Sequence, residues 1–77
     1  MEPTQRERVL KRLIEEGEVD NFWAFHSYIL RLGAIIHGLR KEGYTIESVY
    51  GKERGYARPF WKNCYYILKS KPHVDVF

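Results

Sequence analysis

Hydrophobic residues recur at helical spacing in the middle of the chain. Leu32, Ile36 and Leu39 are four and three positions apart, so they share one side of a helix. Ile35 lies on the border of that side. The opposite side carries small or basic residues and a histidine, namely Arg31, Ala34, His37, Gly38 and Lys41. The pattern predicts a helix over residues 29–42, with a narrow apolar side for a small core and a cationic side for an anionic partner.

A capping pattern and an apolar stripe predict an earlier helix over residues 5–16. Thr4 and Glu7 have the spacing of a capping box, in which the threonine side chain accepts a hydrogen bond from the Glu7 amide. The apolar side of this helix consists of Val9, Leu10, Leu13 and Ile14. Gly17 follows, and glycine commonly ends a helix.

A second, shorter helix is predicted next along the chain. Asp20 can serve as its N-cap, because Asp accepts a hydrogen bond from an early helical amide. Phe22 and Phe25 are three positions apart and are expected to point inward, whereas Trp23 is expected to point elsewhere. This helix, a short turn at Ser27 and the basic helix that follows form the pattern of a helix-turn-helix.

The last third of the chain has the pattern of a β-hairpin. Residues 44–50 are rich in β-branched and aromatic residues and predict a strand, and residues 61–68 predict a second one. Between them, residues 51–59 contain two glycines and a proline and predict a loop. One face of the second strand carries Cys64, Tyr66 and Leu68. Val19 is expected to be buried, and a short third strand near Val19 is compatible with the pattern.

Positive charge is concentrated after the first helix. The net charge is +3, but the first twenty residues carry −2 and the remaining residues carry +5. Segregated positive charge suits a surface that faces phosphate groups. Aromatic residues make up 16% of the chain, more than the core of a 77-residue domain is expected to hold, so some rings are expected to face a partner.

No pattern in the sequence predicts catalysis, a metal site or a bound cofactor. His26, His37 and His73 lack the spacing of metal ligands, and the sequence contains neither paired catalytic carboxylates nor a phosphate-binding loop. The single cysteine, Cys64, is expected to be a small buried residue in a reducing compartment. A non-enzymatic cytoplasmic protein is therefore expected, and no long apolar run predicts a membrane segment.

Four segments of the chain resemble a known family in content and order. They are Thr-Gln-Arg-Glu-Arg-Val-Leu at 4–10, Arg-Leu-Gly-Ala at 31–34 followed by Ile-His at 36–37, Leu-Arg-Lys-Glu-Gly-Tyr at 39–44, and Tyr-Ile-Leu at 66–68. Together they resemble the small winged helix-turn-helix domains found in phage and prophage proteins. The resemblance implies an α+β fold in which three helices are followed by a β-hairpin wing, with the domain over residues 1–69 and a tail over 70–77.

The resemblance implies a transcription regulator whose partner is double-stranded DNA. The helix over 29–42 would enter the major groove, where Arg31 can bond guanine O6 and N7 together. The wing, residues 51–62, carries four basic residues and one acid and would contact the phosphate backbone. The predicted DNA-contacting residues are Arg31, Ala34, His37, Gly38, Arg40 and Lys41 on the helix and Lys52, Arg54, Tyr56, Arg58 and Lys62 on the wing. The basic side of the helix and the wing tip are expected to form one continuous ridge.

Protein binding is the alternative function for the same scaffold. Leu30 stands where the family has a capping threonine, and Ile35 stands where a basic residue is common, so the basic helix is less polar than in the family. Aromatic residues and arginine are enriched at protein interfaces. A host protein and a second copy of the chain are therefore further candidate partners. The candidate interface residues are Trp23, Leu30, Ile35 and Trp61.

Overall fold

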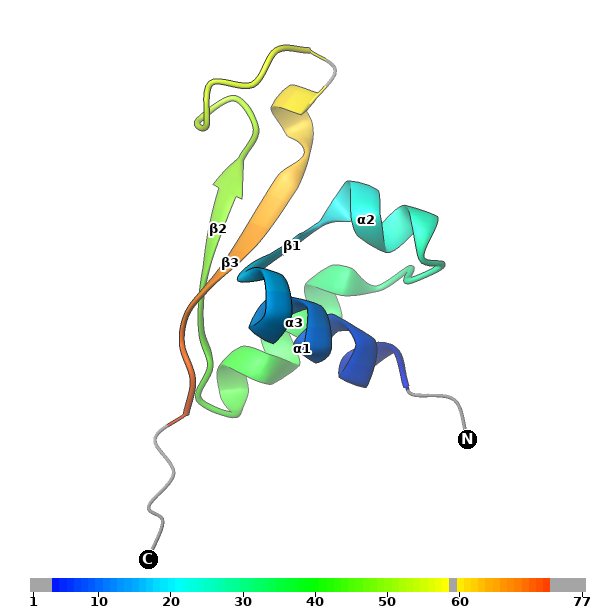
Figure 1. Cartoon of the computed structure of the whole chain (residues 1–77), viewed down its shortest axis with the longest axis vertical. Coiled ribbons are helices and arrows are strands. Elements are labelled where there is room, and N and C mark those ends of the chain that lie inside the picture. Colours follow the sequence, from blue (N-terminus) through cyan, green and yellow to red (C-terminus); the bar gives the residue numbers. More distant parts are fainter. Residues whose placement is uncertain (1–3, 59, 73–77) are drawn as a thin grey trace, which may run out of the picture.

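The computed structural model describes residues 4–58 and 60–72 of the 77-residue chain. Its elements in chain order are α1 (Gln5–Glu16), β1 (Glu18–Asp20), α2 (Asn21–His26), α3 (Leu32–Lys41), β2 (Thr45–Tyr50), the 3-10 turn η1 (Phe60–Lys62) and β3 (Cys64–Ser70). The strands form one antiparallel sheet in the order β1–β3–β2. Figure 1 shows the helices grouped on one side of the sheet and the β2–β3 hairpin extending beyond them. The fold is therefore α+β.

The core lies between the three helices and the inner face of the sheet. Its buried residues are Val9, Leu13, Val19, Ala24, Ile29, Leu32, Ile36, Leu39 and Ile46. The predicted apolar side of the basic helix is confirmed, because Leu32, Ile36 and Leu39 are all buried and Ile35 is half-buried at their border. Full burial of one such side chain stabilises the fold by ~1.5–3 kcal/mol, so this side fixes how α3 sits.

The first helix forms over the predicted residues, Gln5–Glu16. Thr4 Oγ1 accepts a hydrogen bond from the Glu7 amide at 3.1 Å, which confirms the threonine half of the capping box. Gly17 follows the helix with a φ of 83°, a left-handed conformation that glycine adopts without steric cost. The apolar stripe is only partly buried, since Ile14 at its outer edge is 48% exposed.

The short strand near Val19 is confirmed as β1. Val19 pairs with Tyr66 of the central strand β3, and the Leu68 amide donates to the Gly17 carbonyl oxygen at 2.9 Å just beyond this ladder. The predicted inner face of β3 is also confirmed, because Cys64 is buried and the other two residues pack against the core. Burial, followed by a hydrogen bond with Cys64, raises the pKa of Tyr66 to about 12, so its hydroxyl stays neutral.

Some predicted boundaries differ from the structure. α3 begins at Leu32 and not at residue 29, because Ile29 and Leu30 belong to the turn before it. β3 begins at residue 64 and not at 61, because η1 occupies Phe60–Lys62. β3 continues to Ser70, past the predicted end of the domain at residue 69. Most of the predicted tail, residues 73–77, lies outside the described part of the chain.

The orientation predicted for the second helix is wrong. Phe22 and Phe25 are 55% and 71% exposed, whereas Ala24 is 2% exposed. Trp23 was expected to point away from the core but packs against it, beneath the Arg12 guanidinium at 5.2 Å. At ~100° per residue, Ala24 lies about 160° around the helix from Phe22 and about 100° from Phe25, so docking through Ala24 turns both rings away from the core. Its small side chain lets this short helix approach the core closely.

A tyrosine occupies a glycine-type position at the end of α2. The Tyr28 amide donates to the Phe25 carbonyl oxygen at 3.2 Å, and the Ile29 amide donates to the Ala24 carbonyl oxygen at 2.8 Å. This is the Schellman turn, whose key residue adopts a left-handed conformation. Tyr28 has a φ of 59°, whereas Gly43 occupies the same position after α3 with a φ of 106°. A side chain in this conformation costs roughly 1–2 kcal/mol, so the Tyr28 backbone is strained.

Replacing a core leucine should destabilise the fold far more than replacing its exposed neighbour. Leu13→Ala removes a fully buried side chain and should lower the free energy of unfolding by ~2–5 kcal/mol. Ile14→Ala, the matched control on the same helix, should lower it by less than about 1 kcal/mol, because Ile14 is half exposed. Urea denaturation followed by circular dichroism measures both. Equal losses would contradict this placement of the core.

Removing the strain at Tyr28 should stabilise the protein. Tyr28→Gly should raise the free energy of unfolding by up to about 1 kcal/mol, because relief of ~1–2 kcal/mol of strain exceeds the entropy cost of a glycine, ~0.5–1 kcal/mol. Tyr28→Ala, the control, removes the ring but keeps a side chain at positive φ and should give no gain. The same denaturation assay compares them. A glycine variant no more stable than the alanine variant would contradict the assigned conformation.

Candidate nucleic-acid interface

The outward side of α3 presents basic and small residues. Arg31 occupies the N-cap position without a side-chain capping hydrogen bond, and no acid lies in the first turn of the helix. Ala34, His37 and Lys41 are exposed, and Gly38 is half-buried with open space around the position of a Cβ atom. The first amides of a helix favour a negative group, and here neither a capping side chain nor a carboxylate satisfies them. This side can therefore accept an anionic partner at close range.

Arg40 forms hydrogen bonds within the fold. Its guanidinium donates to the Ile46 carbonyl oxygen at 3.1 and 2.7 Å and to Ser48 Oγ at 2.8 Å. These bonds hold α3 against β2. The Nε and Nη2 groups of Arg40 are thus used within the fold, although the side chain is exposed, and its predicted phosphate contact stays a prediction. Near the same end of the helix, Glu42 forms an ion pair with Arg6 of α1.

The base of the wing folds back on the sheet. The Lys52 amide donates to the Trp61 carbonyl oxygen at 3.1 Å, which continues the hairpin beyond β2. Tyr56 then returns to the outer face of β3, where its ring meets the Tyr65 ring edge-on at 5.5 Å. The described part of the wing is therefore attached to the sheet by both backbone and ring contacts.

Arg54 anchors the wing. It donates two hydrogen bonds to the Glu18 carboxylate, at 2.8 and 3.3 Å, and its guanidinium lies over the rings of Tyr56 and Tyr65 at 5.3 and 4.8 Å. The hydrogen bond to Glu18 raises the pKa of Arg54 above its ordinary value, so the charge pair persists. Arg54 therefore has a structural role in the wing, and its predicted DNA contact stays a prediction.

The remaining wing cations gather around one ring. The Arg58 guanidinium lies 4.2 Å and the Lys52 ammonium 5.3 Å from the centre of the Trp61 ring. Lys62 follows Trp61 in the sequence and is exposed. A cation over an aromatic face is held without neutralising its charge. These three predicted residues therefore keep a positive charge available to a partner.

Two hydrogen bonds that the sequence did not predict join Asn63, directly after the wing, to the start of α2. Asn63 Nδ2 donates to Asp20 Oδ2 at 2.8 Å, and Asn63 Oδ1 accepts from the Phe22 amide at 3.2 Å. Asp20 also accepts from the Trp23 amide at 3.4 Å, as predicted for an N-cap. Asp20 was recognised from its position before a helix. Its bond to Asn63 joins residues 43 positions apart, for which the sequence carries no local signal.

The two basic areas do not form the expected continuous ridge. Arg40 contacts the first half of β2, beside the C-terminal end of α3, whereas the wing begins where β2 ends. A six-residue strand spans ~20 Å, so Lys41 and the wing lie at different ends of the hairpin. Figure 1 shows this separation along the long axis of the molecule. The prediction of one ridge is therefore replaced by two separate basic areas.

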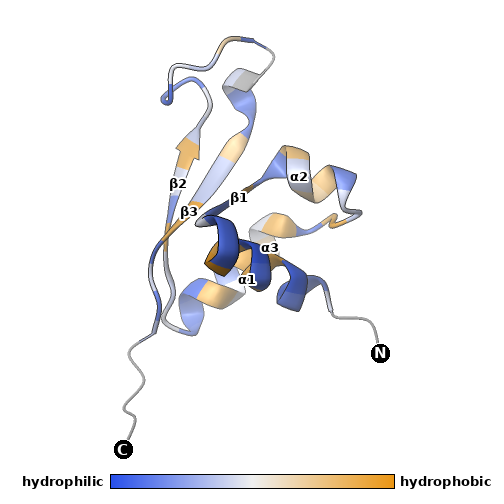
Figure 2. Cartoon of the chain, viewed as in Figure 1, coloured by the Kyte–Doolittle hydropathy of each residue, from blue (hydrophilic) through white to orange (hydrophobic). Residues whose placement is uncertain are grey.

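The candidate protein-interface residues divide into two groups. Leu30 is 82% exposed, but Trp23, Ile35 and Trp61 are half-buried. Three aromatic rings that were not among the candidates are also exposed. Two are the phenylalanines of α2, and the third is Tyr28 in the connection after α2, which is 83% exposed. In Figure 2 the ribbon of α2 and of its connection to α3 includes hydrophobic segments, coloured orange. Sequence analysis placed these phenylalanines in the core and so missed most of this surface.

Within residues 4–58 and 60–72, no three His, Cys, Asp or Glu side chains come together as a metal site. None of the helices in the same residues combines the length and the apolar character needed to cross a bilayer.

The Arg54–Glu18 pair should contribute measurable coupling to stability. A double-mutant cycle with Arg54→Ala and Glu18→Ala should give a coupling free energy of ~0.5–1 kcal/mol, since two hydrogen bonds join half-buried side chains. The matched cycle with Lys69→Ala and Glu47→Ala, whose charged atoms lie 4.0 Å apart on more exposed side chains, should give a value near zero. Urea denaturation provides both values. Equal coupling in the two cycles would contradict an anchored wing.

Comparison of the chain with protein-family models, with curated proteins and with solved structures gave no match. The geometry of the chain itself therefore carries the functional argument.

Proposed function

We propose that this protein is a winged-helix DNA-binding protein that acts as a small transcription regulator, of the kind that phage genomes encode. The order of its elements supports the proposal. β1 separates the first two helices, α2 and α3 follow one another through a tight turn, and a hairpin follows α3. Such an arrangement presents the third helix and the hairpin loop as the two contact elements of a helix-turn-helix domain with a wing.

The observation that carries the proposal is the open side of α3. Its buried side is fully used by the core, so the side with Arg31 and Lys41 faces outward. Ala34 and Gly38 lie between them and leave room for close approach. An arginine near the start of such a helix can bond guanine O6 and N7, a contact worth ~1–3 kcal/mol of discrimination. α3 would thus enter the major groove by its N-terminal half.

The wing would contact the backbone beside that groove. Lys52, Arg58 and Lys62 are exposed beyond the end of β2, away from the C-terminal end of α3. The major groove is ~12 Å wide and phosphates line its edges, so a helix in the groove requires its backbone contacts at a distance from the helix itself. The separation of the two basic areas is compatible with this requirement. The anchor formed by Arg54 would hold the wing cations in place before binding, which lowers the entropy cost of association.

DNA binding should depend on salt and on cations of both areas. With a mixed-sequence duplex, affinity in fluorescence anisotropy should fall steeply between about 50 mM and about 200 mM salt. Arg58→Ala should weaken binding and reduce the salt slope by about one, because it removes a cation assigned to a phosphate. Arg31→Ala should weaken binding by ~1–3 kcal/mol on duplexes that present a guanine to it, because it removes the proposed base contact.

The control variant for DNA binding removes one positive charge that lies outside α3 and the wing. Lys69 lies on β3 with its ammonium 4.0 Å from Glu47, outside both basic areas. Lys69→Ala should therefore leave the affinity and the salt slope nearly unchanged. The proposal fails if the protein does not bind at low salt, if binding is equal at both salt concentrations, or if the three variants behave alike.

Protein binding is a second candidate function, favoured by one specific observation. The exposed residues Phe25, Tyr28 and Leu30 lie within a six-residue stretch, and apolar patches of this kind on a monomer often mark interaction sites. DNA offers few apolar groups to such a surface, since thymine methyl groups are the main ones in the major groove. Capture of a partner by the wild type but not by a Leu30→Ser variant would support this function.

A further inference from the structure

An exposed apolar surface follows α2. We define the aromatic surface as Phe25, Tyr28 and Leu30, which are 71%, 83% and 82% exposed. With ~150–250 Å² for a fully exposed aromatic side chain, their exposed area is on the order of 400–500 Å². That is within the range of ~300–600 Å² for the largest apolar patch on a typical monomer, and such patches are often functional. A surface of this size is suited to a partner.

Backbone strain coincides with the most exposed ring of this surface. Tyr28 holds a left-handed conformation that glycine would adopt without strain, as Gly43 does after α3. The turn itself therefore does not require a tyrosine. Strain of this kind persists mainly where the strained residue serves a function. Because the Tyr28 side chain extends into solvent, that function would involve a contact outside the molecule.

The charge next to the aromatic surface specifies the chemistry of its partner. Arg31 follows Leu30 directly and is exposed, and among the described residues it has no ion-pair partner. α3 also has no acid in its first turn. An occupant of the aromatic surface should therefore combine an apolar face with carboxylates at its edge.

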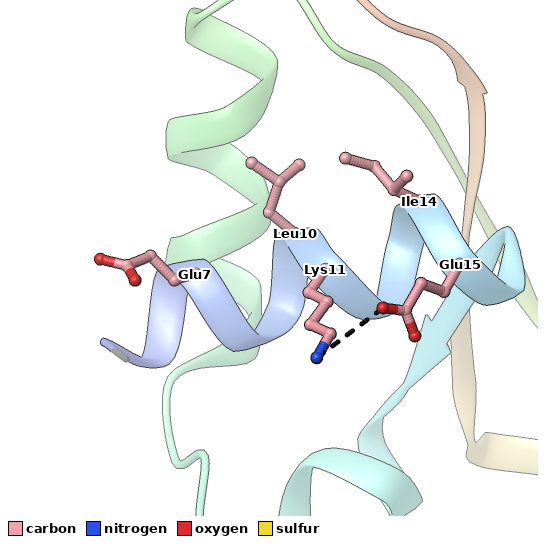
Figure 3. A pocket seen from close by; sticks show the side chains of 5 residues that line it. All are labelled: Glu7, Leu10, Lys11, Ile14 and Glu15. Carbon is pink, nitrogen blue, oxygen red and sulfur yellow. Dashed lines mark ion pairs between the residues drawn. The ribbon is translucent and has the colours of Figure 1, made fainter. Parts of the chain in front are cut away.

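The outer face of α1 has this combination. A groove of about 330 Å³ lies over Leu10 and Ile14 and is bordered by Glu7, Lys11 and Glu15. Figure 3 shows Leu10 and Ile14 pointing the same way from α1, with Lys11 and Glu15 pointing the other way and Glu7 one turn before Leu10. Lys11 lies 3.8 Å from Glu15, whereas Glu7 has no ion-pair partner among the described residues. We call this site the α1 groove.

We infer that the aromatic surface of one copy of this chain binds the α1 groove of a second copy. Tyr28 and Leu30 would cover Ile14, which is half exposed, and Arg31 would face Glu7. Charge favours this pairing over a symmetric one, since two aromatic surfaces in contact would bring two copies of Arg31 together. The inference concerns self-assembly and goes beyond the proposed DNA binding.

This contact joins different surfaces on the two copies, so each copy keeps one free surface of each kind at the ends of the assembly. A heterologous contact of this kind gives open chains or closed rings. The apolar area is small, and total buried areas under ~1,200 Å² belong to weak, transient interfaces. Assembly should therefore increase with protein concentration. Because Arg31 is also the proposed major-groove residue, assembly and DNA binding would compete for it.

Sedimentation equilibrium without DNA tests the inference with complementary variants. The surface variant, Tyr28→Gly with Leu30→Ser, lacks the aromatic surface, and the groove variant, Ile14→Glu, lacks an apolar groove. The average mass of the wild type should rise with concentration and fall again with added salt. Each variant alone should self-associate at least about tenfold more weakly than the wild type. An equimolar mixture should form a 1:1 heterodimer and nothing larger, because only one intact contact remains.

A control and three outcomes decide the result. Tyr50→Ser removes a half-exposed ring outside both surfaces and should assemble like the wild type. A cooperative thermal unfolding transition shows that each variant is folded. A variant without such a transition is replaced by another substitution at the same position. The inference is overturned if the wild type stays monomeric at every concentration, or if the groove variant alone still associates. It is also overturned if the mixture stays monomeric while the wild type assembles.

Discussion

Burial of one side of α3 is the constraint on which the rest of the structure depends. Leu32, Ile36 and Leu39 lie at the centre of a core that α1, α2 and the sheet surround. A chain of this size buries only ~60% of its unfolded surface, so few contacts carry its stability. With that side committed to the core, the opposite side must face outward. Arg31 and Lys41 are exposed for this reason, and the proposed contact with DNA follows from it.

Hydrogen bonds within the fold decide which cations remain available to a partner. Arg40 and Arg54 lie in basic segments, as Lys41 and Arg58 do, yet the first two are bound to β2 and to Glu18. An arginine whose donors are used in this way positions an element of the fold. A cation over a ring, such as Arg58, keeps its charge exposed. The basic surface is therefore smaller and more divided than the count of lysines and arginines suggests.

The turns that end α2 and α3 show how one backbone geometry can serve two purposes. Gly43 adopts the left-handed conformation freely. The Cβ atom of Pro72 lies 3.2 Å from the position that a Cβ atom on residue 43 would occupy. That turn is therefore explained by local packing alone. Tyr28 adopts a similar conformation at a cost, and its ring packs on little of its own chain. The difference between the two positions is the physical reason for placing an intermolecular contact at the end of α2.

The elements that could be predicted from the sequence are those whose signals are local. Thr4 and Glu7 marked the start of α1, and periodicity predicted the buried sides of α3 and β3, because capping and periodicity involve residues close in the chain. The rotation of α2 depends on contacts across the fold, since docking through Ala24 or through the phenylalanines fits the same short pattern. The role of Arg54 also depends on such a contact, because its partner Glu18 is 36 residues away. Local spacing selects helices and strands, whereas contacts between distant residues select which faces and charges remain exposed.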